Sequence, residues 1–505
     1  MAEEAQASGV LVSELLTAGR GILADSTDIV RLGRHYGENR FTTKEMIALE
    51  QSLIACAGRL AATDSHQLAS ETVIRVLSQS GSSLSEEQMK AVWHITMETG
   101  AFAGVSGIAG SGKTRTLSAA RNAWESEGYR IEGTAVATLV ARELEENYGV
   151  PSQTITRLLL AIEKGHSALD AKSILVVDEA GMVATPELER LVRHCEAVGA
   201  KLVLIGDERQ LQPIGPGAPF LELGKRLGYA DLQDIRRQNE SWAKKAVKDI
   251  AEGRAREALE AFVSRGLVTV SETQMEAMQS LVSAWRADGL PLTDTLILAA
   301  TRADVAALNH LAQAERLATN EIGGVPVFMA SDTFYLGDRV LFTKNHKAMG
   351  VINGEYGVLQ NIDTERGRAS VVLDSGEKVS FEVDAIEDIS LGYAATTHKA
   401  QGATTMRAYI LAGGFMQDRE LSYVQASRSE EKTTFYLTRL EAGDEIARLA
   451  KAMERSRQKS MAHSLVREQP EFQYSVQPDS EHDRQHDRPN TSELNMGESF
   501  GFDDR

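Results

Sequence analysis

The sequence predicts an α/β protein with two doubly wound domains. The segment GIAGSGKT (107–114) follows a strand-like run and precedes a helical one. The apolar runs in SILVVDEAG (173–181) and KLVLIGD (201–207) both end at Asp, as strands buried in a parallel sheet do. DTLILAATRADVAALNHLAQ (294–313) then reads strand, turn and helix again, so a second α/β unit begins there.

Length and composition set the frame for this assignment. A chain of 505 residues needs several domains at the usual size of about 150 residues each. No run approaches the ~20 apolar residues of a membrane helix, and MAEEAQASGV lacks the features of a signal peptide. The only cysteines, Cys56 and Cys195, exclude a disulfide framework and a multi-cysteine zinc site. We therefore expect a cytoplasmic protein with no membrane partner.

The net charge of −18 argues against a protein that coats nucleic acid through a generally basic surface. It leaves room for a motor whose positive charge lies only along a channel.

Residues 1–80 are predicted to be a helical N-terminal region. In TTKEMIALEQSLIACAGRLA (42–61) a Thr and a nearby Glu precede apolar residues at helical spacing. SQSGSSLSEE (78–87) marks a break before the next unit.

Residues 81–235 are predicted to form the first α/β domain, and this domain is expected to bind a phosphate group. The glycines at 107, 110 and 112 allow backbone N–H groups to turn toward phosphate oxygens, and the following helix adds a favourable dipole. Lys113 would reach the β- and γ-phosphates and the Thr114 hydroxyl would bind Mg²⁺. The sequence thus predicts ATP and Mg²⁺ as ligands.

Two carboxylates end the strand in ILVVDE. A phosphate loop needs one carboxylate to hold the metal and another to orient the attacking water. Asp178 suits the first role and Glu179 the second. Gln210 follows the next buried strand, where it could contact the γ-phosphate or the water.

The sequence patterns divide residues 236–505 into further predicted regions. We expect a helical connection over 236–290, the second α/β domain over 291–337 and 384–460, and a disordered acidic tail over 461–505. Between them, 338–383 holds short strand-like runs with a hairpin tip at SGEK (375–378), which predicts an inserted β-barrel.

Eight segments now occur in a fixed order: LSEEQ, GIAGSGKT, GTAVATLVARELEE, VVDEAGM, GDERQLQPI, IRRQ, LGYAATTHKAQGAT and YVQASRSE. This set resembles the superfamily 1 DNA helicases and, within them, the RecD-like 5′→3′ group. It is most similar to the helicase part of conjugative relaxase–helicases of the TraI/TrwC type. The resemblance implies two RecA-like P-loop NTPase domains, an SH3-like barrel insert and an ATP-dependent DNA helicase.

The resemblance also implies individual roles. Gln88 would read the adenine edge, Gln210 would sense the γ-phosphate, and Arg237 and Arg428 would be arginine fingers. Arg236 is the rival of Arg237. The residues expected around ATP are Gln88, Gly107, Gly110, Ser111, Gly112, Lys113, Thr114 and Gly402, with Thr114 and Asp178 at the metal.

DNA contact in a translocating motor must be largely independent of sequence, which calls for phosphate contacts and stacking. The expected DNA contacts are Thr138, Thr397, His398 and Lys399. The expected partners are single-stranded DNA, duplex junctions, and a relaxase or another DNA-processing protein.

A relaxase needs a histidine cluster and a nucleophilic tyrosine near its amino end. Tyr36 has no such cluster beside it, so we expect the nicking part to be absent from these residues. A repair or recombination helicase of the RecD type remains an alternative. So does a DNA-stimulated ATPase or single-strand-binding module that does not unwind duplexes.

Overall fold

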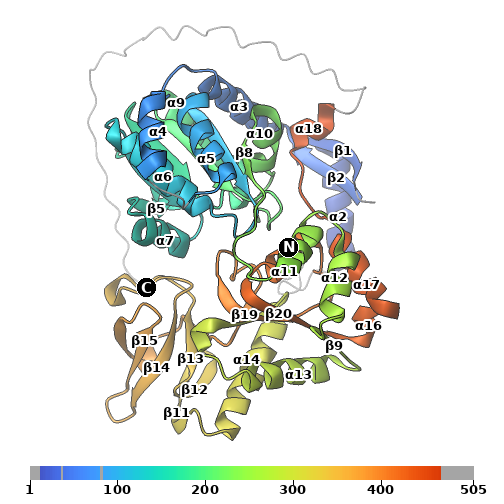
Figure 1. Ribbon diagram of the computed structural model, residues 1–505. Coiled ribbons are helices and arrows are strands. Elements are labelled where there is room, and N and C mark those ends of the chain that lie inside the picture. Colours follow the sequence, from blue (N-terminus) through green and yellow to red (C-terminus); the bar gives the residue numbers. More distant parts are fainter. Residues whose placement is uncertain (1–11, 36–37, 80–83, 468–505) are drawn as a thin grey trace, which may run out of the picture.

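The computed structural model describes residues 12–35, 38–79 and 84–467, and two parallel β-sheets organise it. Figure 1 shows the first sheet and its helices in the upper half and the second in the lower half. Tyr36 and the predicted tail from 468 onward lie outside the described residues.

The first sheet has six parallel strands in the order β5-β4-β6-β7-β3-β8. The apolar runs of the sequence form its centre, where every residue of β3, β6 and β7 is buried. Its strands are β3 (Phe102–Gly107), β4 (Arg130–Ala135), β5 (Ser152–Thr154), β6 (Ser173–Val177), β7 (Lys201–Gly206) and β8 (Ala230–Leu232).

Two apolar clusters cover the two faces of this sheet, one built around Leu202 and Leu204 and the other around Val203 and Ile205. Alternation along β7 thus sends successive side chains to opposite cores. The helices of this half are α5 (Glu86–Trp93), α6 (Lys113–Ser126), α7 (Thr138–Tyr148), α8 (Ile155–Glu163), α9 (Thr185–Val198) and α10 (Pro219–Leu227).

The N-terminal region contains helices and also a β-hairpin, which the prediction of a purely helical region missed. Its elements are α2 (Val12–Asp25), β1 (Ile29–His35), β2 (Glu38–Thr43), α3 (Lys44–Ala61) and α4 (Ser70–Gln79). The predicted helix over 42–61 is confirmed as α3, capped by the Thr43 side chain. It packs its buried face, including Leu53 and Leu60, into the core of the first sheet.

The second sheet has five parallel strands in the order β18-β10-β19-β20-β9. Its strands are β9 (Val268–Ser271), β10 (Thr295–Ala299), β18 (Ala394–Thr396), β19 (Thr405–Leu411) and β20 (Ser429–Thr438). Its helices are α11 (Ser241–Ala251), α12 (Ala255–Val263), α13 (Gln274–Ala287), α14 (Arg302–Ala318) and α15 (Arg419–Ala426). The strand–turn–helix predicted over 294–313 is confirmed as β10 and α14.

The stretch 236–290 is therefore more than the helical connection that we expected. β9 pairs with β20 along Phe435, so this stretch supplies an edge strand of the second sheet. Four residues of moderate burial gave too short a pattern to be read as a strand.

The insert is a five-stranded antiparallel sheet in the order β16-β15-β14-β13-β17. It comprises β13 (Arg339–Phe342), β14 (Tyr356–Asp363), β15 (Arg368–Leu373), β16 (Lys378–Glu382) and β17 (Ile389–Leu391), and β11 (Gly323–Met329) pairs with β12 (Asp332–Leu336) beside it. The predicted hairpin tip at 375–378 is confirmed by the pairing of β15 with β16. β17 belongs to this sheet by pairing with β13, so the insert reaches past its predicted end at 383.

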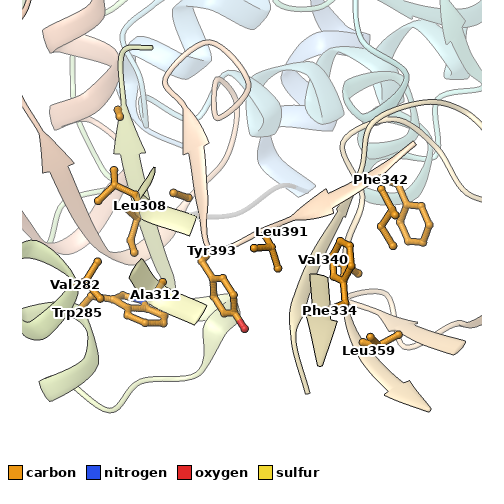
Figure 2. Packing of buried hydrophobic residues seen from close by; sticks show 14 of the residues in the cluster. Val282, Trp285, Leu308, Ala312, Phe334, Val340, Phe342, Leu359, Leu391 and Tyr393 are labelled. Carbon is orange, nitrogen blue, oxygen red and sulfur yellow. The ribbon is translucent and has the colours of Figure 1, made fainter. Parts of the chain in front are cut away.

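One continuous core joins the insert to the second sheet. Figure 2 shows Trp285 of α13 and Leu308 of α14 on one side, and Val340 and Leu359 of the insert on the other, with Tyr393 between them. The Tyr393 hydroxyl donates to the buried carboxylate of Asp338 at 2.5 Å, which fixes the junction.

The chain after the second sheet returns to the first half of the molecule. α16 (Arg439–Ala442) and α17 (Ala447–Glu454) pack on the second half, and residues 455–467 then run back to α3 and the β1–β2 hairpin. Residues 461–467 are ordered, contrary to the expected disorder: α18 (Ala462–Arg467) begins beside Glu50, whose buried carboxylate accepts the backbone N–H groups of Ala462 and His463. Composition alone could not reveal this contact with a residue four hundred positions earlier.

Among the described residues, no helix combines the length and the apolar character that crossing a bilayer would require.

Candidate nucleotide site and nucleic-acid interface

A cavity of about 550 Å³ lies between the two halves, at the carboxyl edge of the first sheet. The phosphate-loop segment and the carboxylates after β6 line it from the first half. The segments 402–404 and 428–430 line it from the second half, and Arg236 and Arg237 line it from the chain that joins the halves. A ligand in this cavity would touch both halves at once.

The phosphate loop has the backbone geometry that its glycines allow. Gly110 and Gly112 have φ values of 79° and 81°, in the region that favours glycine. A Cβ on Gly110 would lie 2.4 Å from the Cβ of Arg237, so a side chain there would also collide with the arginine. The Lys113 ammonium donates to the carbonyl of Gly107 at 2.8 Å, across the mouth of the loop.

Negative charge gathers opposite this lysine. Asp178, Glu179 and Glu143 all line the cavity. Desolvation and the charge of Glu179 raise the pKa of Asp178, and Lys113 opposes that shift. Desolvation and the charge of Glu179 also raise the pKa of Glu143. The negative charge of these carboxyl groups makes the cavity attractive to a cation.

Glu179 is also held in an uncommon conformation. Its φ of 47° and ψ of 42° place a non-glycine residue in the left-handed region, directly after β6. Such strain is kept where the surroundings fix it, and it commonly marks a functional position.

The donors on this wall fit Mg²⁺. The Thr114 hydroxyl accepts a hydrogen bond from Tyr148 at 2.8 Å and lines the same cavity as Asp178. No cluster of three or more metal-binding side chains occurs among the described residues. An ion that takes one or two protein oxygens and completes its shell with water and phosphate, as Mg²⁺ does, suits this set.

Gln210 reaches the cavity with a free carbonyl. Its Nε2 donates to Asp207 Oδ2 at 3.1 Å, while its buried Oε1 has no partner among the described residues. An unpaired buried acceptor at a cavity wall is costly, and a bound water or ligand would satisfy it.

Both predicted arginine fingers line the cavity. Arg237 donates to the carbonyl of Ser427 at 2.9 Å, and Arg428 is 1% exposed and donates to Val424, Ala403 and Ser427. Desolvation and the charge of Arg237 lower the pKa of Arg428 to about 10. Two neighbouring cations with only neutral acceptors favour an anion between them and the phosphate loop.

Gln88 is placed differently from the expectation. It is fully buried under the loop and does not line the cavity. Its Oε1 accepts from Ser85 N in a capping box, and its Nε2 donates to the carbonyl of Ser111 at 2.9 Å. One end of the amide caps α5 and the other supports the loop, so an adenine contact would require these bonds to break.

The predicted DNA contacts divide into two groups. His398 and Lys399 are exposed in the loop after β18, and Thr138 is half-exposed at the start of α7. Thr397 is 0% exposed, and its hydroxyl donates to Ala299 and accepts from Gln425, which contradicts a direct contact with DNA. Loop position alone could not tell which of three consecutive side chains points inward.

Sequence reasoning missed several residues of this region. Arg302 is the first residue of α14 and lies near the loop after β18. Desolvation and the charge of Arg302 lower the pKa of Lys399, so two cations lie together. Glu143 and Tyr148 come from α7; Glu143 lies inside the segment GTAVATLVARELEE, but the sequence did not single out either residue. Gly402, in contrast, lines the cavity as expected.

Comparison with known proteins agrees with this geometry. The family model described as an AAA domain matches residues 83–273. The "Probable conjugal transfer protein TraA" of Sinorhizobium fredii is 38% identical over 407 residues, which is 79% of this chain and 36% of that protein. The ATP-dependent RecD2 DNA helicase of Deinococcus radiodurans is 27% identical over 405 residues, covering 78% of this chain and 55% of that protein.

A crystal structure of Pif1 helicase from Bacteroides, in complex with ADP-AlF3 and ssDNA, is also similar. Its TM-score is 0.46 at 20% identity, over 69% of this chain and 92% of that one.

The ordered motifs, the match to the AAA domain and the two relatives agree on one family. These matches support a RecD-like superfamily 1 helicase that is related to the conjugative relaxase–helicases.

Proposed function

We propose that this chain is an ATP-dependent DNA helicase that moves 5′→3′ along single-stranded DNA. The observation that carries the proposal is one cavity that is lined by a phosphate loop, by the carboxylates after β6 and by Arg237 and Arg428. In this proposal 81–235 is the first RecA-like domain. The second extends from about 236 to 460 around an SH3-like insert.

The side chains of the cavity divide the work of ATP hydrolysis. Backbone N–H groups of the loop and Lys113 bind the β- and γ-phosphates. Glu179 orients the attacking water and takes its proton, and the Gln210 carbonyl accepts from the same water. Arg237 and Arg428 stabilise the charge that spreads over the transferring phosphoryl group.

Thr114 and Asp178 would hold Mg²⁺, which neutralises phosphate charge and orients the β- and γ-oxygens. The crowded carboxyls and the Thr114 hydroxyl support this assignment.

Movement along DNA follows from closure of the cavity. Arg428 contacts the nucleotide only when the two halves are close together, so ATP favours the closed form and hydrolysis releases it. The exposed cations Lys399 and Arg302 bind the phosphate backbone from the second domain, and the half-exposed Thr138 contacts it from the first.

The similarity to conjugal transfer protein TraA supports a role in conjugal transfer, and we propose a relaxase as a partner in that role. The RecD2 similarity supports the helicase chemistry equally well in repair.

Single-turnover unwinding of matched duplexes tests the proposal. A duplex with a 5′ single-stranded tail should be unwound with ATP and Mg²⁺, and one with a 3′ tail should not. Equal unwinding of both, or ATP hydrolysis without unwinding, would contradict the proposal.

Lys113→Ala should abolish ATP hydrolysis and leave single-strand binding measurable. Lys201→Ala is not a suitable control because Lys201 is buried, whereas Lys90→Ala removes an exposed lysine of the same domain and should change neither.

A further inference from the structure

Helix α15 contributes a buried tyrosine, Tyr423, to the contact between the two halves. Tyr423 is 0% exposed. Its hydroxyl accepts from the backbone N–H of Ala109 in the phosphate loop at 2.6 Å and donates to Asp207 Oδ2 at 2.6 Å. One phenol of the second half therefore joins two separate segments of the first.

Asp207 passes this contact on to Gln210. Its Oδ2 accepts both the Tyr423 hydroxyl and the Gln210 amide, and its Oδ1 accepts the backbone N–H of Arg209. The shared carboxylate oxygen fixes which end of the Gln210 amide faces inward. The carbonyl Oε1 of Gln210, a residue that lines the cavity, is left buried without a partner among the described residues because the amide bonds through Nε2.

The phenol keeps its proton in this arrangement. Burial and the charge of Asp207 raise the pKa of Tyr423 well above its ordinary value. The hydroxyl is thus a donor to Asp207 and an acceptor from Ala109 at the same time.

The other face of α15 contacts the loop that carries the exposed cations. Gln425 Nε2 donates to Thr397 Oγ1 at 3.1 Å, and the next two residues are His398 and Lys399. Only Val424 stands between Tyr423 and Gln425, so one helical turn touches both the candidate nucleotide cavity and the loop after β18.

We propose that Tyr423 is a positioning residue that aligns Gln210 and the phosphate loop with the second domain. Through α15 it makes this alignment depend on the loop at 397–399. The proposal rests on the proposed ATPase function. It assigns to a tyrosine the step by which DNA on the second domain stimulates hydrolysis in the cavity.

The test uses Tyr423→Phe in the full chain, which keeps the ring and removes the hydroxyl. Tyr409→Phe is the matched control, because Tyr409 is a buried tyrosine of the same half whose hydroxyl donates to Asp288, away from the cavity. The variant loses a buried hydrogen bond and leaves the Ala109 N–H unpaired. The equilibrium constant that favours the aligned arrangement of Gln210 and the phosphate loop should therefore fall by about 5- to 30-fold.

Steady-state hydrolysis with saturating oligo-dT is the first measurement. Tyr423→Phe should lower the DNA-stimulated kcat by about 5- to 30-fold with little change in KM for ATP. Tyr409→Phe should leave both unchanged. A wild-type kcat in Tyr423→Phe would overturn the proposal.

A double-mutant cycle with Gln210→Ala separates positioning from general destabilisation. If Tyr423 acts through Gln210, the double variant should be about as slow as Gln210→Ala alone. Independent, multiplicative losses would overturn the proposed route.

Amide exchange at Ala109 in the nucleotide-free protein tests the contact without relying on hydrolysis. Tyr423→Phe should exchange this amide about 5- to 30-fold faster than wild type, and Tyr409→Phe should not. Unchanged exchange would overturn the proposal even if the wild type hydrolyses ATP. A wild type with no ATPase activity would instead refute the proposed function.

Discussion

The loop after β18 offers a sharp test of how the protein holds DNA, because neighbouring residues there have opposite environments. Lys399 is exposed and lies near Arg302, whereas Thr397 is fully buried and hydrogen-bonded on both sides. The informative changes are Lys399→Ala, which removes one exposed cation, and Thr397→Val, which removes a buried hydroxyl at nearly constant volume.

The expected size of the effect follows from counterion release. One lost phosphate contact on a single strand should reduce the slope of log K against log salt by about 0.7. When salt is raised from 50 to 200 mM, the affinity of Lys399→Ala for DNA should therefore fall by a factor about 2.5-fold smaller than that of the wild type. Arg302→Ala should behave in the same way, and the double variant should lose about 1.4 from the slope.

Fluorescence anisotropy of labelled oligo-dT, titrated at several salt concentrations, measures these slopes directly. Thr397→Val should keep the wild-type slope, because its hydroxyl contacts only protein atoms. An unchanged slope in Lys399→Ala would refute the placement of DNA at this loop. A reduced slope in Thr397→Val would refute the buried position of that hydroxyl.

Three further predictions concern the structure that supports the site. The buried Glu355 of the insert pairs with Arg142 of α7, so Glu355→Gln should cost about 1–3 kcal/mol in urea denaturation, and an unchanged midpoint would contradict the contact. Gly110→Ala should lose at least about 1 kcal/mol of folding stability, because an alanine is strained at the left-handed φ of this position. It should also bind nucleotide more weakly, because the new Cβ collides with Arg237. Titration with a fluorescent nucleotide measures that affinity, and a normal affinity would contradict the prediction. Burial lowers the pKa of His66, so the unfolded chain binds a proton on this histidine at higher pH than the folded chain does. The free energy of unfolding should therefore fall as the pH drops below about 6.5, and it should fall less in His66→Asn. Equal pH dependence of the two proteins would exclude His66 as the source of the effect.

Much of the candidate nucleotide site could be predicted because its chemistry is local in sequence. Lys113, Asp178 and Gln210 each follow a buried strand, and parallel strands bring their carboxyl ends to one edge. The positions of side chains that depend on long-range packing could not be predicted from the sequence. Gln88 turns beneath the loop because its amide completes a capping box, which leaves no atom for the cavity.

The fold shows the same division. Strands with continuous apolar runs, such as β6 and β7, were predicted from their residues. β9 is a short, half-exposed edge strand, and its pairing with β20 is set by tertiary contact. α18 gains its place from Glu50 and from the core around Met461, neither of which changes the local pattern.

Two chain crossings connect the halves, and both are anchored. In the first, Gln238 donates to the carbonyl of Ser429 and Asn239 N donates to that of Glu430. In the second, the Lys459 ammonium donates to the carbonyls of Ile214 and Gly215.

A body fixed at two separate points on another can turn only about the line that joins them. In the proposed helicase, two attachments would favour one rotation of the second half over the freer motion that a single linker allows, once side-chain contacts such as that of Tyr423 with Ala109 are released. Under the proposed function, each catalytic cycle would then retrace the same arc.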